Sequence, residues 1–516
     1  MQFVRRERIR LMKKIGIGLA TLVALGLLSA CGTSAHSTEN KKDKLEIVTT
    51  FYPMYDFTKN IVGDEANVTV MIPAGSEPHD YEPSAKDMAA VHDADVFVYH
   101  NENMETWVPK AQKSFAKEKP HVVAGTKNMV LLPGGDEEHD HDHSEEDHHH
   151  ELDPHTWVSP YRAIQEVTSI KEQLQKLYPK KAKAFETNAA KYLTELKKLD
   201  QTYSESLHNA KQKSFVTQHA AFGYLALDYG LKQVAISGLS PEQEPSASRL
   251  GELKEYVKDN GIHYIYFEEN ASDKIAKTLA NEADVKMAVL NPLESLTKEQ
   301  IANGESYLSV MKENLQALEK TTEVAGKEVK PEAAATEEKT VANGYFANSA
   351  VKERQLSDFT GKWQSVYPLL TEGALDQVFD YKAKLNQDMT ATQYKEYYTT
   401  GYKTDVEKID ITANTMDFVV NGQHHKYEYV AKGYQILTYD KGNRGVRFLF
   451  EAKEDAGRFQ YVQFSDHNIA PTKTAHFHIY FGGESQNTLL EEMHNWPTYY
   501  PANLSDHAIA QEMMAH

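Results

Sequence analysis

The chain has 516 residues, more than a single hydrophobic core usually organises, so two domains are the starting expectation. Its apolar fraction of 41% and aromatic fraction of 10% are those of a folded protein and exclude a disordered chain. The formal net charge of −19 argues against nucleic acid as a partner, because phosphates need a basic surface, and it is compatible with a cationic ligand.

The N-terminus predicts secretion and lipid attachment. Residues 1–14 are strongly basic, and residues 15–30 form an apolar run that is too short and wrongly flanked for a membrane-spanning helix. The sequence LSAC, which ends at Cys31, is similar to a bacterial lipobox. The similarity implies that residues 1–30 are a signal peptide, and that acylated Cys31 anchors the chain at the extracellular face of the cell membrane. An ordinary signal peptide with a chance cysteine is the alternative.

Cys31 is the only cysteine in the sequence, so any metal must be held by histidine and carboxylate. The polar residues 31–44 predict a flexible tether. No later segment is long and apolar enough to span a bilayer, and no GxxxxGK[ST] phosphate loop is present. If the protein serves transport, its partners move the cargo.

Residues 45–318 alternate β-rich runs with helical patterns, which favours parallel sheets covered by helices. Strands are predicted at residues 45–51, 68–72, 95–100, 214–217, 233–237, 263–269 and 285–290. Within residues 180–209, five apolar residues recur at helical spacing: Phe185, Ala189, Tyr192, Leu196 and Leu199. We interpret this stretch as a long helix that connects two α/β lobes. Periodicity alone fits a surface helix of one domain equally well.

The composition changes at residues 319–344, which lack aromatic residues, leucine and isoleucine and therefore predict a linker. Beyond it, residues 345–516 contain β-runs separated by turn-forming pairs. These pairs are Asn421-Gly422, Lys432-Gly433, Gly442-Asn443 and Ala456-Gly457. Regularly spaced hairpins of this kind predict an antiparallel barrel or sandwich.

A loop at residues 135–150 is rich in histidine and acid. Its histidines are His139, His141, His143, His148, His149 and His150. Such a segment attracts zinc but offers no frame that fixes a tetrahedron, so it predicts recruitment of zinc rather than a tight site. The alternative is a solvated spacer.

Four separate positions predict a tighter metal site. His79, His219 and Glu294 follow predicted strands, and His155 lies just past the histidine-rich loop. Open α/β sheets place ligands at the carboxyl ends of their strands. Two of these positions precede the long helix and two follow it, so a shared site would lie between the lobes. Three imidazoles and one carboxylate complete a four-coordinate zinc site.

The segments PHDYEPS, DPHTWVSP, QHAAFGYLA and NPLESLT resemble motifs of the ZnuA/AdcA type of zinc-binding subunits of ABC importers, over about residues 44–318. The resemblance implies two α/β lobes joined by one long helix, and a permease and its ATPase as partners. It places His79, His155, His219 and Glu294 on the metal positions of the family. Manganese-binding relatives have a glutamate at the position of His219, and imidazole there suits zinc.

A second site is predicted near the C-terminus. In SDHNIAPTKTAHFHIYFG, strand alternation puts His476, His478 and Tyr480 on one face, and His467 comes from a preceding turn. This segment and DFTGKWQSVYPLL resemble ZinT, a periplasmic zinc-binding family with a lipocalin-like barrel, over about residues 345–516. The implied ligands are His467, His476 and His478. The whole chain therefore resembles zinc-import lipoproteins in which both modules are fused.

Three histidines with an open fourth position are also the arrangement of a catalytic zinc, so a zinc-dependent hydrolase is a competing hypothesis for the C-terminal half. A surface zinc store or adhesin would have the same sequence features. No convincing general base accompanies the motif, and the four-ligand site leaves no position for water. We therefore expect a monomeric, non-enzymatic protein that binds about two zinc ions tightly and delivers zinc to an importer. His208, His263, His424 and His494 are assigned to the surface or to packing.

Overall fold

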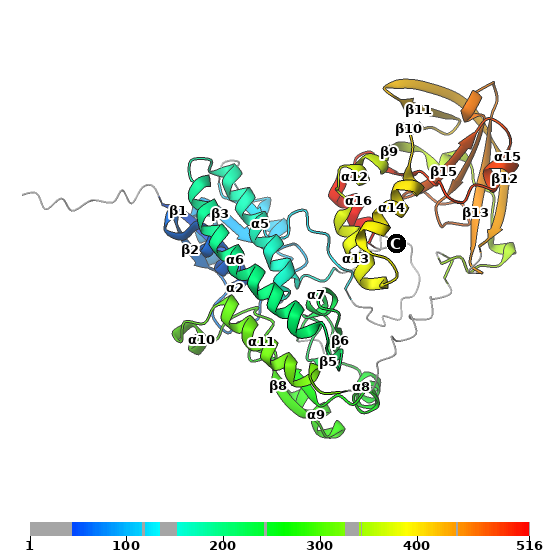
Figure 1. Cartoon of the computed structure of the whole chain (residues 1–516). Helices are drawn as coiled ribbons and strands as arrows, with labels where there is room; N and C mark the ends of the chain where they lie inside the picture. The colour runs from blue at the N-terminus through cyan, green and yellow to red at the C-terminus, as the bar shows by residue number, and fades with distance from the viewer. Residues whose placement is uncertain are drawn as a thin grey trace, which may run out of the picture.

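A computed structural model of the chain describes residues 44–115, 119–134, 152–241, 245–325, 340–341, 343–439 and 442–514. The predicted signal peptide, Cys31, the histidine-rich loop, most of the tether and much of the linker lie outside the described residues. Figure 1 shows an α/β part, coloured blue to green, and a barrel with accompanying helices, coloured yellow to red. Among the described residues, no helix combines the length and the apolar character that a membrane crossing requires.

The first lobe is built on a four-stranded parallel sheet with the order β2-β1-β3-β4. Its strands are β1 (Leu45–Thr49), β2 (Ala66–Val70), β3 (Val96–Tyr99) and β4 (His121–Ala124). Three of them were predicted, whereas β4 was not. Its helices are α2 (Tyr52–Val62), α3 (Ala85–Asp93) and α4 (Val108–Gln112).

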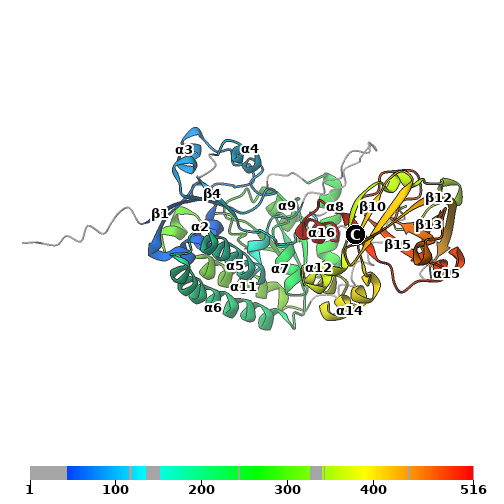
Figure 2. The ribbon, with the colours of Figure 1, turned by 90° about the horizontal axis from the view of Figure 1, so that it is seen from above.

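Both faces of this sheet are covered (Figure 2). Val96 and Val98 pack with α2 and the long helices on one face, while Phe97 and Tyr99 pack with α3 and α4 on the other. Because both faces of the sheet are buried, the sequence of β3 is a continuous apolar run and does not alternate between apolar and polar residues.

The second lobe repeats the plan with the strand order β6-β5-β7-β8, again parallel. Its strands are β5 (Ser214–Thr217), β6 (Lys232–Ala235), β7 (Tyr264–Phe267) and β8 (Lys286–Val289), and all four were predicted. Its helices are α7 (Gly223–Asp228), α8 (Ala247–Asp259), α9 (Lys274–Ala283), α10 (Lys298–Ala302) and α11 (Tyr307–Thr322). Helical structure thus continues to Thr322, past the expected domain boundary at residue 318.

Two long helices join the lobes: α5 (Pro160–Leu177) and α6 (Ala182–Leu207). The five apolar residues predicted to line α6 are all buried. The Tyr192 hydroxyl of α6 donates to Asp56 of α2 over 2.6 Å, and the Tyr203 hydroxyl donates to the Met311 carbonyl of α11 over 2.5 Å. Because α6 packs on both lobes, it is the predicted connecting helix rather than a surface helix of one domain.

The C-terminal part contains a closed barrel with the order β10-β11-β12-β13-β14-β15-β16-β9, all antiparallel. Its strands are β9 (Gly361–Ser365), β10 (Val406–Ile411), β11 (Thr415–Val420), β12 (Gln423–Thr438), β13 (Arg444–Ala452), β14 (Tyr461–Ser465), β15 (Phe477–Gly482) and β16 (Thr498–Pro501). Aromatic side chains such as Phe359, Phe448, Phe464 and Phe477 fill its interior.

The turn-forming pairs of the barrel behave differently from one another. Asn421 and Gly422 have φ values of 48° and 73° and join β11 to β12, as a tight hairpin requires. The pair Lys432-Gly433, expected to separate two β-runs, instead lies inside β12, where the register shifts between Ala431 and Tyr434. A bulge bends the strand at this point without ending it.

Helices α12 (Tyr367–Thr371), α13 (Asp376–Asn386), α14 (Ala391–Tyr402) and α16 (Asp506–Glu512) accompany the barrel, as does α15 (Gln486–Leu490). Figure 1 places α13 against the α/β part. There the Tyr381 hydroxyl donates to the Val130 carbonyl over 2.8 Å, and the Gln511 side chain pairs with both backbone groups of Leu131. The barrel helices therefore hold the segment that leads into the histidine-rich loop.

Charged groups reinforce this junction. Arg162 of α5 pairs with Asp228 of α7 over 2.7 Å and lies over the Tyr381 ring of α13 at 4.2 Å. Lys384 of α13 reaches Asp228 over 2.9 Å. Arg162 and Asp228 are almost fully buried, so each is stabilised only while its partners stay in place. The junction is thus a specific contact between the two parts.

Candidate metal centres

The four residues predicted between the lobes converge on one point. His79 lies in the loop after β2, His155 directly before a 3₁₀ turn (Thr156–Val158), His219 after β5 and Glu294 in the segment after β8. We call this group the interlobe centre. Its members come from both lobes, and only His79 retains appreciable exposure, 10% of its side chain.

The spacing of the ligand atoms suits a tetrahedral metal. The Nε2 atoms of His79, His155 and His219 lie 3.3, 3.4 and 3.2 Å from Glu294 Oε1. His79 Nε2 and His155 Nε2 are 3.1 Å apart. Zinc with ligand bonds of roughly 2.0–2.1 Å would separate its ligand atoms by about 3.3–3.4 Å, the edge of the tetrahedron. The residues present therefore fit zinc with little rearrangement.

Carboxylates orient two of these imidazoles from behind. His155 Nδ1 lies 2.8 Å from Asp153 Oδ1, and His219 Nδ1 lies 2.5 Å from Glu268 Oε1. A metal-binding histidine commonly gives its second ring N–H to a carboxylate, which fixes the ring and its tautomer. The Nε2 atoms of His155 and His219 are thereby directed to the centre.

The charges of the centre are balanced internally. Burial alone would raise the pKa of Glu294. The charge of His219 and hydrogen bonds from the three histidines outweigh burial and hold this pKa well below its usual range. Burial also acts against protonation of His219, but Glu268 and Glu294 raise its pKa well above the usual value. Burial and the Glu294 charge raise the pKa of Glu77, whose carboxylate accepts from the His79 backbone, to about 9. The metal-free centre thus keeps an ionised ligand carboxylate beside a protonated imidazole.

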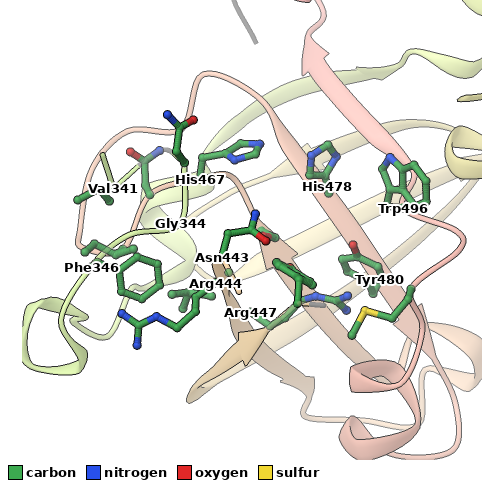
Figure 3. Close-up of a pocket in the computed structure, with 18 of the residues that line it drawn as sticks. Val341, Gly344, Phe346, Asn443, Arg444, Arg447, His467, His478, Tyr480 and Trp496 are labelled. Carbon is green, nitrogen blue, oxygen red and sulfur yellow. The ribbon is translucent and has the colours of Figure 1, made fainter. Parts of the chain in front are cut away.

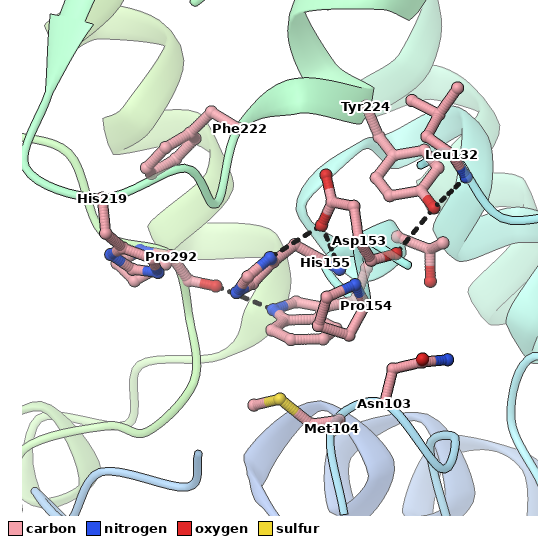
Figure 4. A network of polar contacts seen from close by, with 12 residues as sticks. Asn103, Met104, Leu132, Asp153, Pro154, His155, His219, Phe222, Tyr224 and Pro292 are labelled. Atoms are coloured by element: carbon pink, nitrogen blue, oxygen red, sulfur yellow. Dashed lines mark hydrogen bonds and ion pairs between the residues drawn. The ribbon is translucent and has the colours of Figure 1, made fainter. Parts of the chain in front are cut away.

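The loop that carries His155 is fixed by buried contacts (Figure 4). The Tyr224 hydroxyl donates to the Asp153 carbonyl over 2.8 Å and accepts from the Leu132 N–H over 2.9 Å. His100 Nε2 lies 2.6 Å from the Pro154 carbonyl. These contacts connect the loop that carries His155 to Leu132. Leu132 is two residues before residue 134, the last described residue ahead of the histidine-rich loop.

Backbone geometry also presents Glu294. Leu293, the residue before it, has φ 60°, a left-handed conformation that costs a non-glycine residue roughly 1–3 kcal/mol. The Asn291 side chain accepts from the Leu293 N–H over 2.7 Å and holds this conformation.

The three C-terminal histidines also lie together. The ring centroids of His467, His476 and His478 are 5.7 to 6.0 Å apart, and one ligand atom of each lies within 4.8 Å of the others. We call this group the barrel centre. His467 is exposed and has φ 64°, His476 is buried, and His478 is half-buried. The centre is therefore open on the side of His467.

The predicted alternation along β15 is confirmed. Phe477 and Ile479 are buried in the barrel interior, whereas His478 and Tyr480 point outward. His478 Nδ1 lies 2.7 Å from Thr498 Oγ1, and the His476 ring stacks on Tyr500 at 5.1 Å. A hydroxyl thus contacts one of these imidazoles, and an aromatic ring contacts another.

The structure brings together all seven histidine and glutamate side chains predicted to bind metal, in two groups. The six histidines of the predicted loop lie outside the described residues, and so does Cys31. The four histidines assigned to the surface or to packing are exposed, and these are His208, His263, His424 and His494.

Sequence reasoning missed the residues behind the ligands. Asp153 stands two residues before His155, a spacing that could have identified it. Glu268 follows β7, which neighbours β5, so its position at the same sheet edge as His219 was a second available signal. Nothing in the sequence pointed to Thr498, which reaches His478 only because β16 pairs with β15.

The comparisons with known proteins cover both parts of the chain. The family model for the zinc-uptake complex component A (ZnuA, periplasmic) matches residues 47–321, and the model for ZinT, a periplasmic lipocalin-like zinc-recruitment protein, matches residues 337–516. The zinc-binding lipoprotein AdcA of Streptococcus pneumoniae is 63% identical over 508 residues, 98% of this chain and 100% of the relative. The zinc-binding protein AdcA of Streptococcus pyogenes is 57% identical over 487 residues, 92% and 94% of the two chains.

A solved structure is similar over nearly the same length. The crystal structure of Zn(II)-bound AdcA from Streptococcus pneumoniae has 62% sequence identity and a TM-score of 0.84, and it covers 92% of this chain and 100% of that chain.

Proposed function

The chain belongs to the ZnuA family of zinc-uptake proteins, with a ZinT domain after it, and from this premise we propose that it captures zinc outside the cytoplasm and delivers it to an ABC-type importer. The observation that carries the proposal is the interlobe centre. Three imidazole nitrogens each lie 3.2 to 3.4 Å from one carboxylate oxygen, and the group is buried between two lobes. In this role the permease receives the zinc and its ATPase supplies the energy.

Binding fits the interlobe centre better than catalysis. Four protein ligands fill a tetrahedral zinc shell and leave no position for an activated water. At the barrel centre, the described residues that line the adjoining pocket (Figure 3) include no aspartate or glutamate, the side chains that most often serve as a general base beside a catalytic zinc. We therefore assign binding to both centres and favour import over the hydrolase alternative.

The two centres together give about two zinc ions per chain, held by His79, His155, His219 and Glu294, and by His467, His476 and His478. The barrel centre, which is open, would take zinc first and the interlobe centre would retain it. The chain would act as a monomer on the extracellular side, anchored by lipid on Cys31.

The stoichiometry of zinc tests this proposal. A lipid-free chain that begins at Gly32 is titrated with zinc against a calibrated chelator, and about two tight ions per chain are expected. Manganese should not displace them. A chain with no tight zinc would refute the proposal.

Transport separates import from the store and adhesin alternatives. Cells that lack their own zinc-binding subunit should recover uptake of radioactive zinc at scarce zinc when they carry the natural chain, and not when they carry His155→Ala. Equal uptake from both chains would leave the protein as a store or adhesin.

We propose that the histidine-rich loop recruits zinc for the interlobe centre. The described residues at its two ends are paired through a bridge between Pro133 and Leu152, and the Asp153 N–H donates to the Leu132 carbonyl over 2.9 Å. The described residues that flank the loop therefore lie beside Asp153, the residue that orients His155. Deletion of residues 135–150 should slow uptake at scarce zinc only, and unchanged uptake would reduce the loop to a spacer.

A further inference from the structure

Helix α7 of the second lobe joins three parts of the chain at one side chain. Its Tyr224 hydroxyl donates to the Asp153 carbonyl and accepts from the Leu132 N–H, and both of these residues precede the long helices (Figure 4). The Tyr224 ring is fully buried and packs in a hydrophobic cluster with side chains of the barrel helices, among them Tyr381. The second lobe, the loop that carries His155 and the C-terminal part therefore meet at Tyr224.

The barrel helices fix the segment that leads from β4 toward the histidine-rich loop. The Gln377 side chain of α13 accepts from the Val130 N–H over 3.0 Å and donates to the Asn128 carbonyl over 2.9 Å. The Gln511 side chain of α16 pairs in the same way with both backbone groups of Leu131, over 2.8 Å in each case. Two glutamine side chains thus satisfy backbone groups that a neighbouring strand would otherwise have to pair.

The residues that follow connect this segment to a predicted metal ligand. The Leu132 carbonyl accepts from the Asp153 N–H over 2.9 Å. The Asp153 carboxylate accepts from the His155 N–H over 2.9 Å and lies 2.8 Å from His155 Nδ1. Gly223, the first residue of α7, allows this close approach, because a Cβ there would lie 2.9 Å from Asp153 Oδ2. A continuous series of contacts therefore runs from the barrel helices to the His155 ring.

Ion pairs hold α13 against α7 at the same junction (Figure 1). The Lys384 ammonium lies 2.9 Å from Asp228 of α7 and 2.9 Å from Asp380 of α13. It also lies 4.0 Å from the centroid of the Tyr161 ring. Asp228 is almost fully buried and pairs with Arg162 as well. A buried carboxylate depends on its cationic partners, so movement of α13 away from α7 would destabilise Asp228.

We propose that the barrel helices α13 and α16 hold His155 in its metal-binding position, so that their docking on the α/β part slows the release of zinc from the interlobe centre. This inference rests on the proposed role of the interlobe centre as a zinc site. Gln377, Tyr381, Lys384 and Gln511 are then positioning residues, since they act on His155 through residues 128–132 and Asp153. The C-terminal part thereby has a second role beside that of its own centre.

The test measures how fast zinc leaves the interlobe centre of the full chain. Every protein carries His476→Ala, which removes a ligand of the barrel centre, and an excess of a fluorescent chelator records the zinc released in a stopped-flow instrument. Lys384→Glu places a third carboxylate beside Asp228 and Asp380. It should speed release roughly 3- to 30-fold, the range that changes within a coupled network of contacts produce. Lys384→Arg, which keeps the charge, should release zinc at the parent rate.

A matched charge reversal locates the effect. Lys395 of α14 pairs with Asp376 over 2.6 Å, within the C-terminal part. Lys395→Glu should therefore release zinc at the parent rate. If Lys384→Glu releases zinc no faster than Lys395→Glu, the inference is overturned. Absence of tight zinc from the parent protein, which carries His476→Ala alone, would instead refute the proposed function of the interlobe centre.

A pair of hydroxyl deletions decides the matter if Lys384→Glu does not fold. Tyr381→Phe loses the contact with the Val130 carbonyl and should speed zinc release roughly 2- to 10-fold, the size of one lost hydrogen bond. Tyr394→Phe loses contacts with Asn386 and Asp388, which both lie in the C-terminal part, and should leave the rate unchanged. Equal release rates from these two variants would overturn the inference.

Discussion

The two candidate metal centres of this chain differ in the charge of the side chains that would surround the ion. At the interlobe centre a carboxylate is a ligand, and Asp153 and Glu268 stand behind two of the imidazoles. At the barrel centre the candidate ligands among the described residues are three imidazoles, two of which contact a hydroxyl or an aromatic ring. The first centre is closed over by both lobes, and the second is open on the side of His467.

This difference suits the interlobe centre to retaining an ion and the barrel centre to exchanging one. A buried site that supplies its own negative charge and all four ligands holds a cation without help from solvent. A candidate site of three imidazoles, one of which is exposed, allows its ion to enter and leave more readily. One chain would therefore combine an open receiving site with a closed holding site.

The largest expected effects come from removal of single ligands. His155→Ala should abolish tight zinc binding at the interlobe centre and leave the barrel centre intact. The loss of affinity should exceed the roughly 10- to 100-fold cost of changing a residue that only hydrogen-bonds to a ligand. His476→Ala should do the reverse. Chelator competition should show about one zinc per chain in each case. Loss of both ions from either variant would mean that the centres are not independent.

A change of ligand chemistry at one position should sharpen the contrast. His219→Glu places a third carboxylate beside Glu268 and Glu294, and mutual repulsion raises the pKa values of such groups. We expect zinc affinity to fall on the order of 100-fold, with manganese affected less because it prefers oxygen ligands. Metal competition measures the ratio, and unchanged zinc affinity would contradict the view that this imidazole selects zinc.

Much of this contrast was predictable from the sequence. His79, His219 and Glu294 could be assigned because each follows a strand, and parallel strands bring their carboxyl ends to one edge. His476 and His478 could be assigned to one face because side chains alternate along a strand. The long helix followed from Phe185 and the apolar residues that recur after it.

The remainder depends on contacts between distant parts of the chain. Strand β4 was missed because it is only four residues long and most of its side chains are only partly buried. The pairing of Thr498 with His478 needs the closure of the barrel, and the contact of Tyr381 with Val130 joins residues 251 positions apart. Arg447 reads in sequence as an ordinary outward residue of a strand, and only the folded loop over it makes it part of a pocket.

Substitution of the residues that hydrogen-bond to the ligand histidines should show how much each centre's zinc affinity depends on these contacts. Asp153→Asn should weaken zinc at the interlobe centre roughly 10- to 100-fold, because an amide orients the His155 ring without strengthening its donor nitrogen. Thr498→Val, the corresponding change at the barrel centre, removes a neutral partner and should cost less than about tenfold. Titration of each variant with a chelator measures both values. If the two changes cost the same, the carboxylates do not distinguish the centres.

The smallest effect concerns protons. Burial lowers the pKa of His219, but Glu268 and Glu294 outweigh it and raise the pKa well above the usual value, so the metal-free centre carries a proton on His219 at pH 7. Zinc needs the neutral ring, so this proton must leave, and affinity should fall as the pH falls. Calorimetry in buffers of different ionisation enthalpy should detect release of about one proton or more per zinc at pH 7.

Glu268→Gln removes one of the two charges that raise the pKa of His219, so the variant should release fewer protons and show a shallower dependence of zinc affinity on pH. Glu77→Gln is the matched control for the second titrating group, since Glu77, with its pKa of about 9, is also protonated at pH 7 in the metal-free centre. If the Glu268 variant releases as many protons as the natural chain, the proton leaves from elsewhere. The internal ion pair would then not be what prepares the interlobe centre for its cation.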